Sequence, residues 1–152
     1  MTKIAFIGLG TMGGPMARVL RNAGHDVMGM DVSADMRAAF NGAMEPSGDA
    51  VSQADVVITM LPEGRHVTEV HDTLVRPHAT PETRLIDCST IDVESTKALA
   101  NAAQAQGFGM LDAPVSGGPA GAETGSLSFM VGGPEEAFQQ NLPLLEIGRA
   151  HV

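Results

Sequence analysis

Residues 3–31 read KIAFIGLGTMGGPMARVLRNAGHDVMGMD, and this stretch decides the fold. It predicts a buried strand over Lys3–Gly8, a helix over Met12–Ala23 and a second strand over Asp26–Asp31. Apolar residues recur every four positions along the helix, and Gly24 ends it. Two strands joined through a helix form a βαβ unit, in which the strands lie parallel.

The rest of the chain continues this alternation of strands and helices. We expect further strands over Asp55–Met60, Arg84–Asp87, Met110–Ala113 and Leu127–Val131. We expect further helices over 34–41, over His66–Leu74, between a cap at Asp92 and a stop at Gly107, and over Pro134–Leu145. This alternation predicts a Rossmann-type α/β fold, a doubly wound, mostly parallel sheet with helices on both faces. Residues 1–152 are assigned to one dinucleotide-binding domain.

The turn between the first strand and the first helix carries the motif G-x-G-x-x-G, written Gly8-Leu9-Gly10-Thr11-Met12-Gly13. In this position Gly8 permits a tight turn, Gly10 lets the backbone approach a pyrophosphate, and Gly13 lets the helix pack closely on the strand. The helix N-terminus adds free N–H groups and the positive end of its dipole. No Gly-Lys-Ser/Thr follows the motif, which excludes a P-loop. The six residues are therefore predicted to bind a dinucleotide.

Asp31 ends the second strand near the position, about 20 residues after the glycine motif, where a ribose-binding acid stands. Its carboxylate is expected to accept hydrogen bonds from both hydroxyls of an adenosine ribose. A 2′-phosphate would lie about 5 Å from this like charge, which costs several kcal/mol before screening. The next residue is Val32, and no arginine follows until Arg37, so nothing offsets the repulsion. NAD is therefore predicted as the cofactor in preference to NADP.

Composition excludes several other classes of protein. Nine Lys and Arg stand against 18 Asp and Glu, which gives a net charge of −9, and the chain has no Trp or Tyr. Nucleic acid and anionic membrane surfaces are therefore not expected as partners. One cysteine, Cys88, excludes an intrachain disulfide and a cysteine-rich zinc site, and no metal is expected. Without a run of about 18 apolar residues or a signal-peptide cleavage pattern, a cytoplasmic location is expected.

The remaining polar residues are assigned structural roles. Cys88 is expected to be a small buried residue at a strand end. His66 and His71 would lie about 140° apart around a helix, which does not suit a shared metal ion. Glu63, Glu69 and the other acidic residues are expected on solvated faces, with no carboxylate pair for acid–base catalysis.

Four longer motifs carry a resemblance to a known family. GLGTMGGPMARVL (8–20), ITMLPEGRHV (58–67), LIDCSTID (85–92) and DAPVSGGPAGAETGSLSFMVGG (112–133) resemble, in this order, sequence blocks of the β-hydroxyacid dehydrogenase family. That family includes 3-hydroxyisobutyrate dehydrogenases and tartronate semialdehyde reductases, and the third and fourth motifs are most similar to the former. The glycine loop and Asp31 alone would also fit a methyltransferase, which stays a weaker alternative.

The resemblance implies roles for further residues. It implies that Leu61-Pro62 lies along the cofactor ribose, that Thr90 stands beside the nicotinamide, and that Ser116-Gly117-Gly118 holds the carboxylate of the substrate. Two successive glycines let backbone N–H groups converge on such an anion. The family's general acid/base is a lysine on a helix that would follow Val152, so no catalytic residue is assigned within the chain.

The implied function is that of the NAD-binding domain of an oxidoreductase that transfers a hydride between nicotinamide and a small 3-hydroxy acid, such as 3-hydroxyisobutyrate. The helical domain for catalysis and dimerisation is expected outside these residues, so the chain alone is expected to be inactive and the full-length enzyme to be a homo-oligomer. A tartronate semialdehyde reductase-type member and a non-catalytic nucleotide-binding or dimerisation module are the alternatives.

Overall fold

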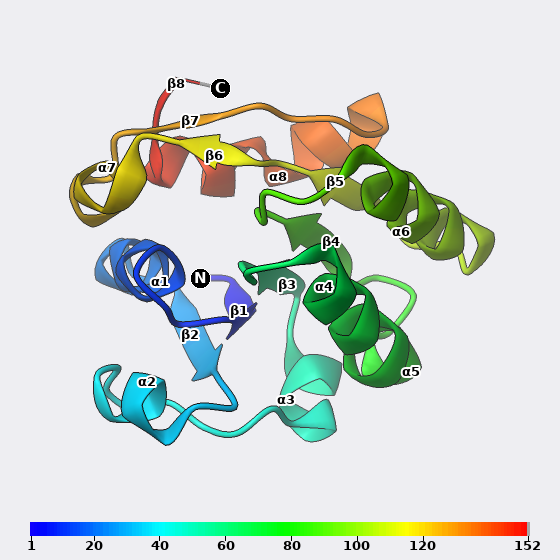
Figure 1. Cartoon of the computed structure of the whole chain (residues 1–152). Helices are drawn as coiled ribbons and strands as arrows, with labels where there is room; N and C mark the ends of the chain where they lie inside the picture. Colours follow the sequence, from blue (N-terminus) through cyan, green and yellow to red (C-terminus); the bar gives the residue numbers. More distant parts are fainter. Residues whose placement is uncertain (152) are drawn as a thin grey trace.

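The computed structural model describes residues 1–151 and is built around a five-stranded sheet of order β2-β1-β3-β4-β5 (Figure 1). Every neighbouring pair of strands in it is parallel. The strands are β1 (Lys3–Ile7), β2 (Asp26–Met30), β3 (Val56–Thr59), β4 (Arg84–Asp87) and β5 (Met110–Asp112). β2 and β3 lie on opposite sides of β1, so the connections from β1 to β2 and from β2 to β3 run in opposite directions across the sheet. At such a topological switch point, ligands bind at the carboxyl ends of the strands.

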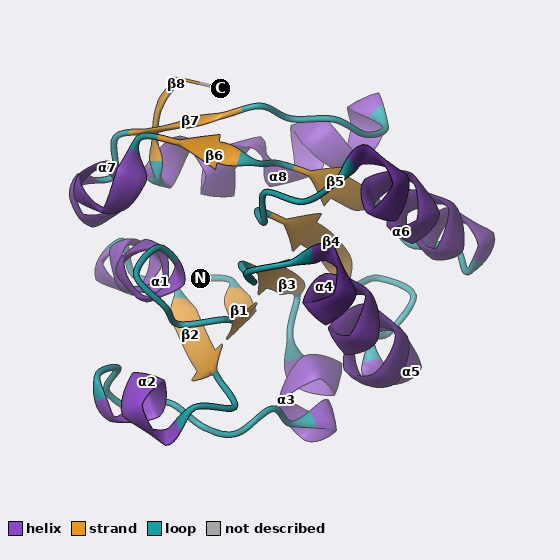
Figure 2. Ribbon diagram, in the orientation of Figure 1, coloured by secondary structure: helices purple, strands orange, loops and turns teal. Residues whose placement is uncertain are grey.

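Helices cover both faces of the sheet (Figure 2), which confirms the doubly wound prediction. Ile4 and Phe6 of β1 face one layer of helices, and the alternate residues Ala5 and Ile7 face the other. Both faces are buried, so the strands are apolar throughout rather than alternating. The first layer contains α1 (Gly13–Asn22), α7 (Gly118–Thr124) and α8 (Glu135–Ile147). The second contains α3 (Gly48–Gln53), α4 (Gly64–Val70) with its continuations η1 (His71–Val75) and α5 (Arg76–His78), and α6 (Val93–Ala105).

The last strands differ from the sequence prediction. The expected sixth strand is the shorter β7 (Leu127–Phe129), and it lies outside the parallel sheet. It pairs antiparallel with β6 (Val115–Ser116) and parallel with β8 (Arg149–His151) in a three-stranded sheet, seen at the top of Figure 1. The composition of residues 127–131 predicted a strand, and its first three residues form one, but pairing depends on residues far away in sequence. Val152 lies outside the described residues.

Two helices also differ from their predicted extents, and a third was not predicted. The helix expected over 34–41 is the shorter α2 (Ala34–Ala38), and α3 was not predicted at all. The Ser47 hydroxyl caps α3 by accepting a hydrogen bond from the backbone N–H of Ala50 at 3.3 Å. The helix expected over His66–Leu74 begins earlier and continues through a π-helical segment, η1. The cap predicted at Asp92 is present, with its carboxylate 2.8 Å from the Ser95 backbone nitrogen. Across residues 1–151, no helix has the length and apolar character that crossing a membrane requires.

Candidate functional site

A cleft of about 830 Å³ opens where the chain leaves the carboxyl ends of β1, β2 and β3, with α4 and η1 as its side wall. Cofactor and small-molecule sites commonly occupy about 300–1,000 Å³ at such a position. Eight of the predicted site residues line it together: Gly8, Gly10, Thr11, Met12, Gly13, Asp31, Leu61 and Pro62. The structure therefore brings together most of the predicted cofactor site from three separate segments of the chain.

The glycine loop is fitted closely between β1, β3 and α1. Gly8 has a φ of +104°, and an added Cβ would overlap the carbonyl oxygen of Met60. At Gly13 an added Cβ would overlap the carbonyl oxygen of Gly8, so α1 begins in direct contact with the end of β1. Gly10 is exposed in the cleft and an added Cβ would meet no heavy atom within 4 Å. Gly8 and Gly13 are thus required by the packing of the loop, whereas Gly10 leaves open space in front of it.

Asp31 joins the end of β2 to the glycine loop. Its Oδ2 accepts a hydrogen bond from the backbone N–H of Leu9 at 2.8 Å, and its Oδ1 accepts one from that of Ser33 at 2.9 Å. Each carboxylate oxygen keeps a second lone pair for a further donor from the cleft. The carboxylate is therefore fixed in orientation by the backbone before any ligand arrives.

Arg37 lies closer to Asp31 than its separation in sequence indicated. One turn of α2 brings its Nη1 within 3.0 Å of the carbonyl oxygens of Asp31 and Val32. Its Nη2 forms an ion pair with Glu45 at 3.6 Å. The guanidinium is thus directed to the backbone and to an acid rather than to the Asp31 carboxylate.

The other predicted residues lie outside the cleft lining. The Leu9 side chain is 4% exposed and belongs to the core, so this residue contributes its backbone alone. Thr90 is exposed just after β4, next to Ser89, whose hydroxyl accepts a hydrogen bond from the Leu61 N–H at 2.8 Å. Ser116–Gly118 is an exposed segment that leads from β6 into α7.

The side wall and part of the floor of the cleft were not predicted from the sequence. These residues are Val32, Met36, Pro46, Met60, His66, Glu69, Val70, Thr73 and Leu74. The available signal was the presence of two large apolar residues, Val32 and Met36, in the mainly polar segment that follows the second strand; both are exposed in the structure. Thr73 and Leu74 lie within the π-helical segment η1, which no helical periodicity predicts.

A chain of buried polar side chains lies behind the Leu61 turn, contrary to the expectation that the acidic residues are solvated. Asp87 is 1% exposed and accepts hydrogen bonds from the Thr59 and Ser89 hydroxyls, at 2.9 and 2.7 Å. The pKa of Asp87 is raised above its ordinary value, because the effect of burial outweighs the lowering by the hydrogen bonds from Ser89 and Thr59. Asp112, at the matching position of β5, has its pKa raised to about 6 by burial and by the charge of Asp87. Asp87 is therefore an exception to the expectation that the acidic residues lie on solvated faces, and the strand register places Asp112 next to it.

His71 is buried beside Thr59. Its Nε2 is 3.2 Å from the Thr59 hydroxyl, and burial together with the nearby charge of Arg76 lowers its pKa to about 4. The ring is therefore neutral at pH 7. Among the side chains of residues 1–149, no three His, Cys, Asp or Glu side chains come close enough together to hold a metal ion.

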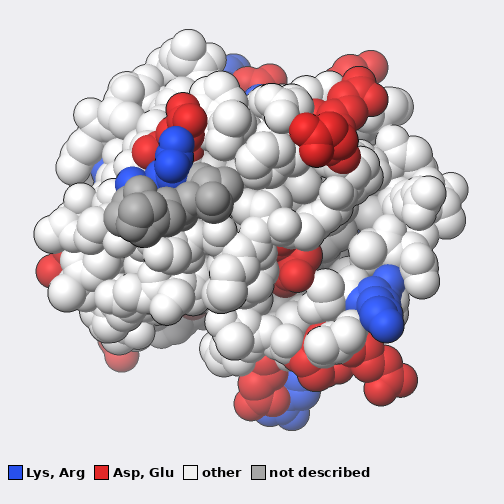
Figure 3. Space-filling model, turned by 90° about the horizontal axis from the view of Figure 1, so that it is seen from above, with Lys and Arg blue, Asp and Glu red and all other residues white. Residues whose placement is uncertain are grey.

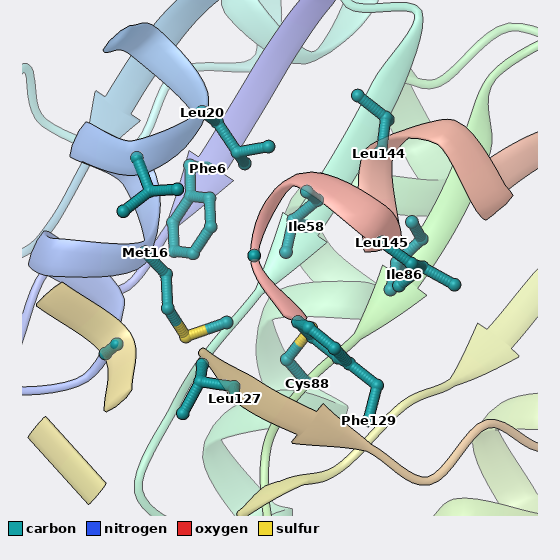
Figure 4. A pocket seen from close by; sticks show the side chains of 13 residues that line it. Phe6, Met16, Leu20, Ile58, Ile86, Cys88, Leu127, Phe129, Leu144 and Leu145 are labelled. Carbon is teal, nitrogen blue, oxygen red and sulfur yellow. The ribbon is translucent and has the colours of Figure 1, made fainter. Parts of the chain in front are cut away.

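A second, much smaller cavity of about 30 Å³ lies between the sheet and the layer of α1, α7 and α8 (Figure 4). Phe6, Leu127, Phe129 and the buried Cys88 are among the apolar side chains that surround it. Burial raises the pKa of the Cys88 thiol, so it stays protonated and its predicted packing role is confirmed. A space of this size has room for about one or two water molecules and is too small for a cofactor or substrate, so it is a packing defect rather than a ligand site.

The surface charge is dispersed on the face that Figure 3 shows. Acidic side chains form several separate groups there, with Lys and Arg among them and wide uncharged areas between. An anionic ligand on this acidic chain must therefore be attracted by local donors, such as those at the start of α1, and not by the overall field.

Comparisons with known proteins agree with this geometry. A family model described as the NAD binding domain of 6-phosphogluconate dehydrogenase matches residues 3–151. The 3-hydroxyisobutyrate dehydrogenase of Pseudomonas aeruginosa is 45% identical, over 96% of this chain and 51% of that protein. The NAD-dependent L-serine dehydrogenase of the same organism is 47% identical with the same coverage.

A solved structure of the 3-hydroxyisobutyrate dehydrogenase of Mycobacterium tuberculosis with L-serine superposes with a TM-score of 0.94 at 41% identity, over 100% of this chain and 54% of that chain. The chain thus spans about half the length of the relatives that it matches. These matches confirm the resemblance to the β-hydroxyacid dehydrogenases, and the chain belongs to the family of NAD-binding domains represented by that of 6-phosphogluconate dehydrogenase.

Proposed function

We propose that this chain forms the cofactor-binding half of an NAD-dependent dehydrogenase that acts on a small 3-hydroxy acid. The observation that carries the proposal is the single cleft that joins the glycine loop, the start of α1 and the carboxylate of Asp31. The glycine loop lets the protein backbone approach a pyrophosphate, and the start of α1 offers N–H groups to its negative charge. The carboxylate of Asp31 accepts hydrogen bonds from the hydroxyls of a ribose.

The pyrophosphate is proposed to lie against Gly10 and the first turn of α1. No side chain in the described part of the chain caps this helix at Met12, and its first turn carries no acidic residue. The free N–H groups and the positive end of the helix dipole are therefore available to an anion. The open space in front of Gly10 lets a phosphate reach the backbone directly.

The preference for NAD over NADP rests on Asp31. Its carboxylate is held in place by the N–H groups of Leu9 and Ser33, so it cannot turn away from a 2′-phosphate without breaking both bonds. Arg37, the nearest cation in sequence, is bound to two carbonyl oxygens and to Glu45. A 2′-phosphate at this place meets a fixed negative charge and a cation that is already engaged.

The substrate class follows from the relatives and from the segment between β6 and α7. The two relatives in Pseudomonas aeruginosa are named for 3-hydroxyisobutyrate and L-serine, which share a carboxylate and a hydroxyl on the third carbon. We assign the carboxylate to Ser116–Gly118 and the nicotinamide to the neighbourhood of Thr90, on the strength of the family resemblance. Tartronate semialdehyde, which carries a carboxylate and an aldehyde that reduction converts into a hydroxyl on the third carbon, remains the alternative.

The acid/base group of the reaction is proposed to lie outside residues 1–152. Lys3 opens β1 at the amino edge of the sheet, away from the cleft at the carboxyl edge, and Lys97 is exposed on α6. NAD, when bound, supplies the nicotinamide carbon that exchanges hydride with the substrate, and a lysine must still take the hydroxyl proton. The chain alone is therefore expected to bind NAD without turning over a hydroxy acid.

A calorimetric titration with NADH and, separately, NADPH tests the proposal. We expect saturable NADH binding that is at least about tenfold tighter than NADPH binding, and Asp31→Ser should narrow that difference. Asp35→Ser, in the exposed helix α2, is the matched control and should leave the ratio unchanged. Tighter binding of NADPH would refute the role of Asp31, and steady NADH production from 3-hydroxyisobutyrate by this chain would refute the absence of the acid/base group.

A further inference from the structure

Thr59 and Asp87 stand side by side at the carboxyl ends of β3 and β4, where the strand register pairs them directly. Both are fully buried, and neither belongs to the lining of the cofactor cleft. Thr59 is followed by Met60 and the Leu61-Pro62 turn, which line the cleft. Asp87 is followed by Ser89 and by Thr90, which the family resemblance assigns to the nicotinamide. The pair therefore directly precedes two segments that are assigned to the site.

The hydrogen atoms in this cluster can be assigned from donor counting. Asp87 as a carboxylate only accepts, so the Thr59 hydroxyl donates its one hydrogen to Oδ1. Thr59 must then accept from His71, which fixes the hydrogen of the neutral ring on Nε2. In the same way the Ser89 hydroxyl donates to Asp87, which leaves the lone pairs of Ser89 free to accept from the N–H of Leu61 at 2.8 Å.

We propose that Asp87 is a positioning residue of the cofactor cleft: its buried carboxylate orients the Ser89 hydroxyl, which holds the Leu61-Pro62 turn against the cofactor. On its other side Asp87 acts through Thr59 on His71, and His71 anchors the π-helical turn from which Thr73 and Leu74 enter the cleft. This inference rests on the proposed function, because it assigns a role in binding the cofactor of that same cleft.

The charge of Asp87 matters as well as its shape. Three hydrogen bonds converge on its Oδ1, from the Thr59 hydroxyl, the Ser89 hydroxyl and the Ser89 backbone at 3.2 Å. A charged acceptor forms bonds about twice as strong as a neutral one, and it can never donate, so both hydroxyls are forced to point inward. The other groups that face the cluster are the neutral His71 and, at the neighbouring strand end, Asp112.

The alternative is that Asp87 serves stability alone. A purely structural role predicts that replacing Asp87 or Ser89 lowers the protection from hydrogen exchange at amides throughout the domain. The positioning role predicts instead that protection falls at the Leu61 amide alone, because that N–H is bonded to Ser89. The adjacent Met60 N–H is bonded to the Ile7 carbonyl oxygen and should keep its protection. These two neighbouring amides therefore separate the two explanations.

The test compares hydrogen exchange at the Leu61 and Met60 amides, and NADH affinity, in Ser89→Ala and Asp87→Asn. Ser52→Ala, whose hydroxyl bonds only within the distant α3, is the matched control. We expect Leu61 exchange to rise about tenfold in Ser89→Ala and by a smaller factor in Asp87→Asn, with Met60 unchanged and NADH binding about tenfold weaker in Ser89→Ala.

Two results would decide against the proposal. Unchanged Leu61 exchange in both variants, or wild-type NADH affinity despite faster Leu61 exchange, would overturn the positioning role alone. If Asp87→Asn loses protection at every amide, Ser89→Ala decides by itself, since it leaves the carboxylate in place. Failure of the wild-type chain to bind NADH would overturn the proposed function and this inference together.

Discussion

Two glycines of the same loop should fail in opposite ways when they are replaced by alanine. At Gly13 an added Cβ would overlap the carbonyl oxygen of Gly8, lie 2.9 Å from its carbonyl carbon and lie 3.3 Å from the Phe6 ring. At Gly10 it would meet nothing within 4 Å, and φ there is not in the left-handed region. Gly13→Ala should therefore unfold the domain more easily, while Gly10→Ala should leave the fold intact and obstruct the cofactor.

The magnitudes follow from these distances. Non-bonded carbons rest about 3.5–4.0 Å apart, so α1 must move away from β1 to accommodate the methyl group of Gly13→Ala, and overpacking against backbone costs about 3 kcal/mol. For a domain of this size, a loss of about 3 kcal/mol in the free energy of unfolding lowers the Tm by about 10 °C. Gly10→Ala should change stability by less than about 0.5 kcal/mol. Its methyl group occupies the space through which the pyrophosphate reaches the backbone, so NADH affinity should fall at least about tenfold.

Thermal melting and fluorescence titration with NADH measure the two effects on the same samples. Gly109→Ala is the matched control, because its Cβ would make an ordinary 3.7 Å contact with Ala137, outside the cleft lining. It should change neither Tm nor affinity. The reasoning is refuted if Gly10→Ala binds NADH as tightly as the wild type, or if Gly13→Ala melts at the wild-type temperature.

Three further predictions concern the buried groups. The folded-state pKa of His71 lies near 4, below its ordinary 6.5, so stability is full above pH 6.5 and about 3 kcal/mol is lost as the pH falls toward 4. His71→Gln, which keeps a neutral donor, should reduce that loss in urea unfolding curves measured at several pH values; an unchanged pH dependence would count against it. The folded-state pKa of Asp112 is raised to about 6, so its charged form weakens the fold above pH 6. Asp112→Asn should stabilise by about 1 kcal/mol at pH 8, after allowing for solvent screening, and have no effect below pH 4, where the wild-type residue is protonated. Leu127→Ala should enlarge the cavity of Figure 4 and cost about 3 kcal/mol in urea unfolding, and a cost below about 1 kcal/mol would mean that the neighbouring side chains close it.

The parallel sheet and the glycine loop were predictable because their signals are local. Each buried strand is a short apolar run, and the glycine motif stands at the junction of one such run with a helix. The loop residues need no distant partner to be recognised. Asp31 was found for the same reason, since it directly follows a strand whose end is marked by the return to polar residues.

Other elements were missed because their signals are short or distant. Helix α3 has six residues, which are too few to show an apolar period, so the capping residue Ser47 is its main signal in the sequence. Strand β7 has the composition of a strand, but its partners β6 and β8 lie in segments for which the sequence predicted no strand. The π-helical turn at η1 breaks the 3.6-residue period, so the Thr73 and Leu74 side of the cleft could not be deduced from spacing.

The buried hydrogen-bonded cluster around Asp87 could also have been predicted from the sequence. Three of the five parallel strands end on a polar residue, at Thr59, Asp87 and Asp112, although the remainder of each strand is mainly apolar. In a parallel sheet the carboxyl ends meet at one edge, so polar side chains at successive strand ends become neighbours. A carboxylate in that position, between two buried strands, must be hydrogen-bonded, because leaving it unpaired costs more than the fold can offset. The hydroxyls of Thr59 and Ser89 donate those bonds, and the Ser89 hydroxyl also accepts a hydrogen bond from the N–H of Leu61 in the cofactor cleft. The polar strand ends therefore join the core of the sheet to its binding edge.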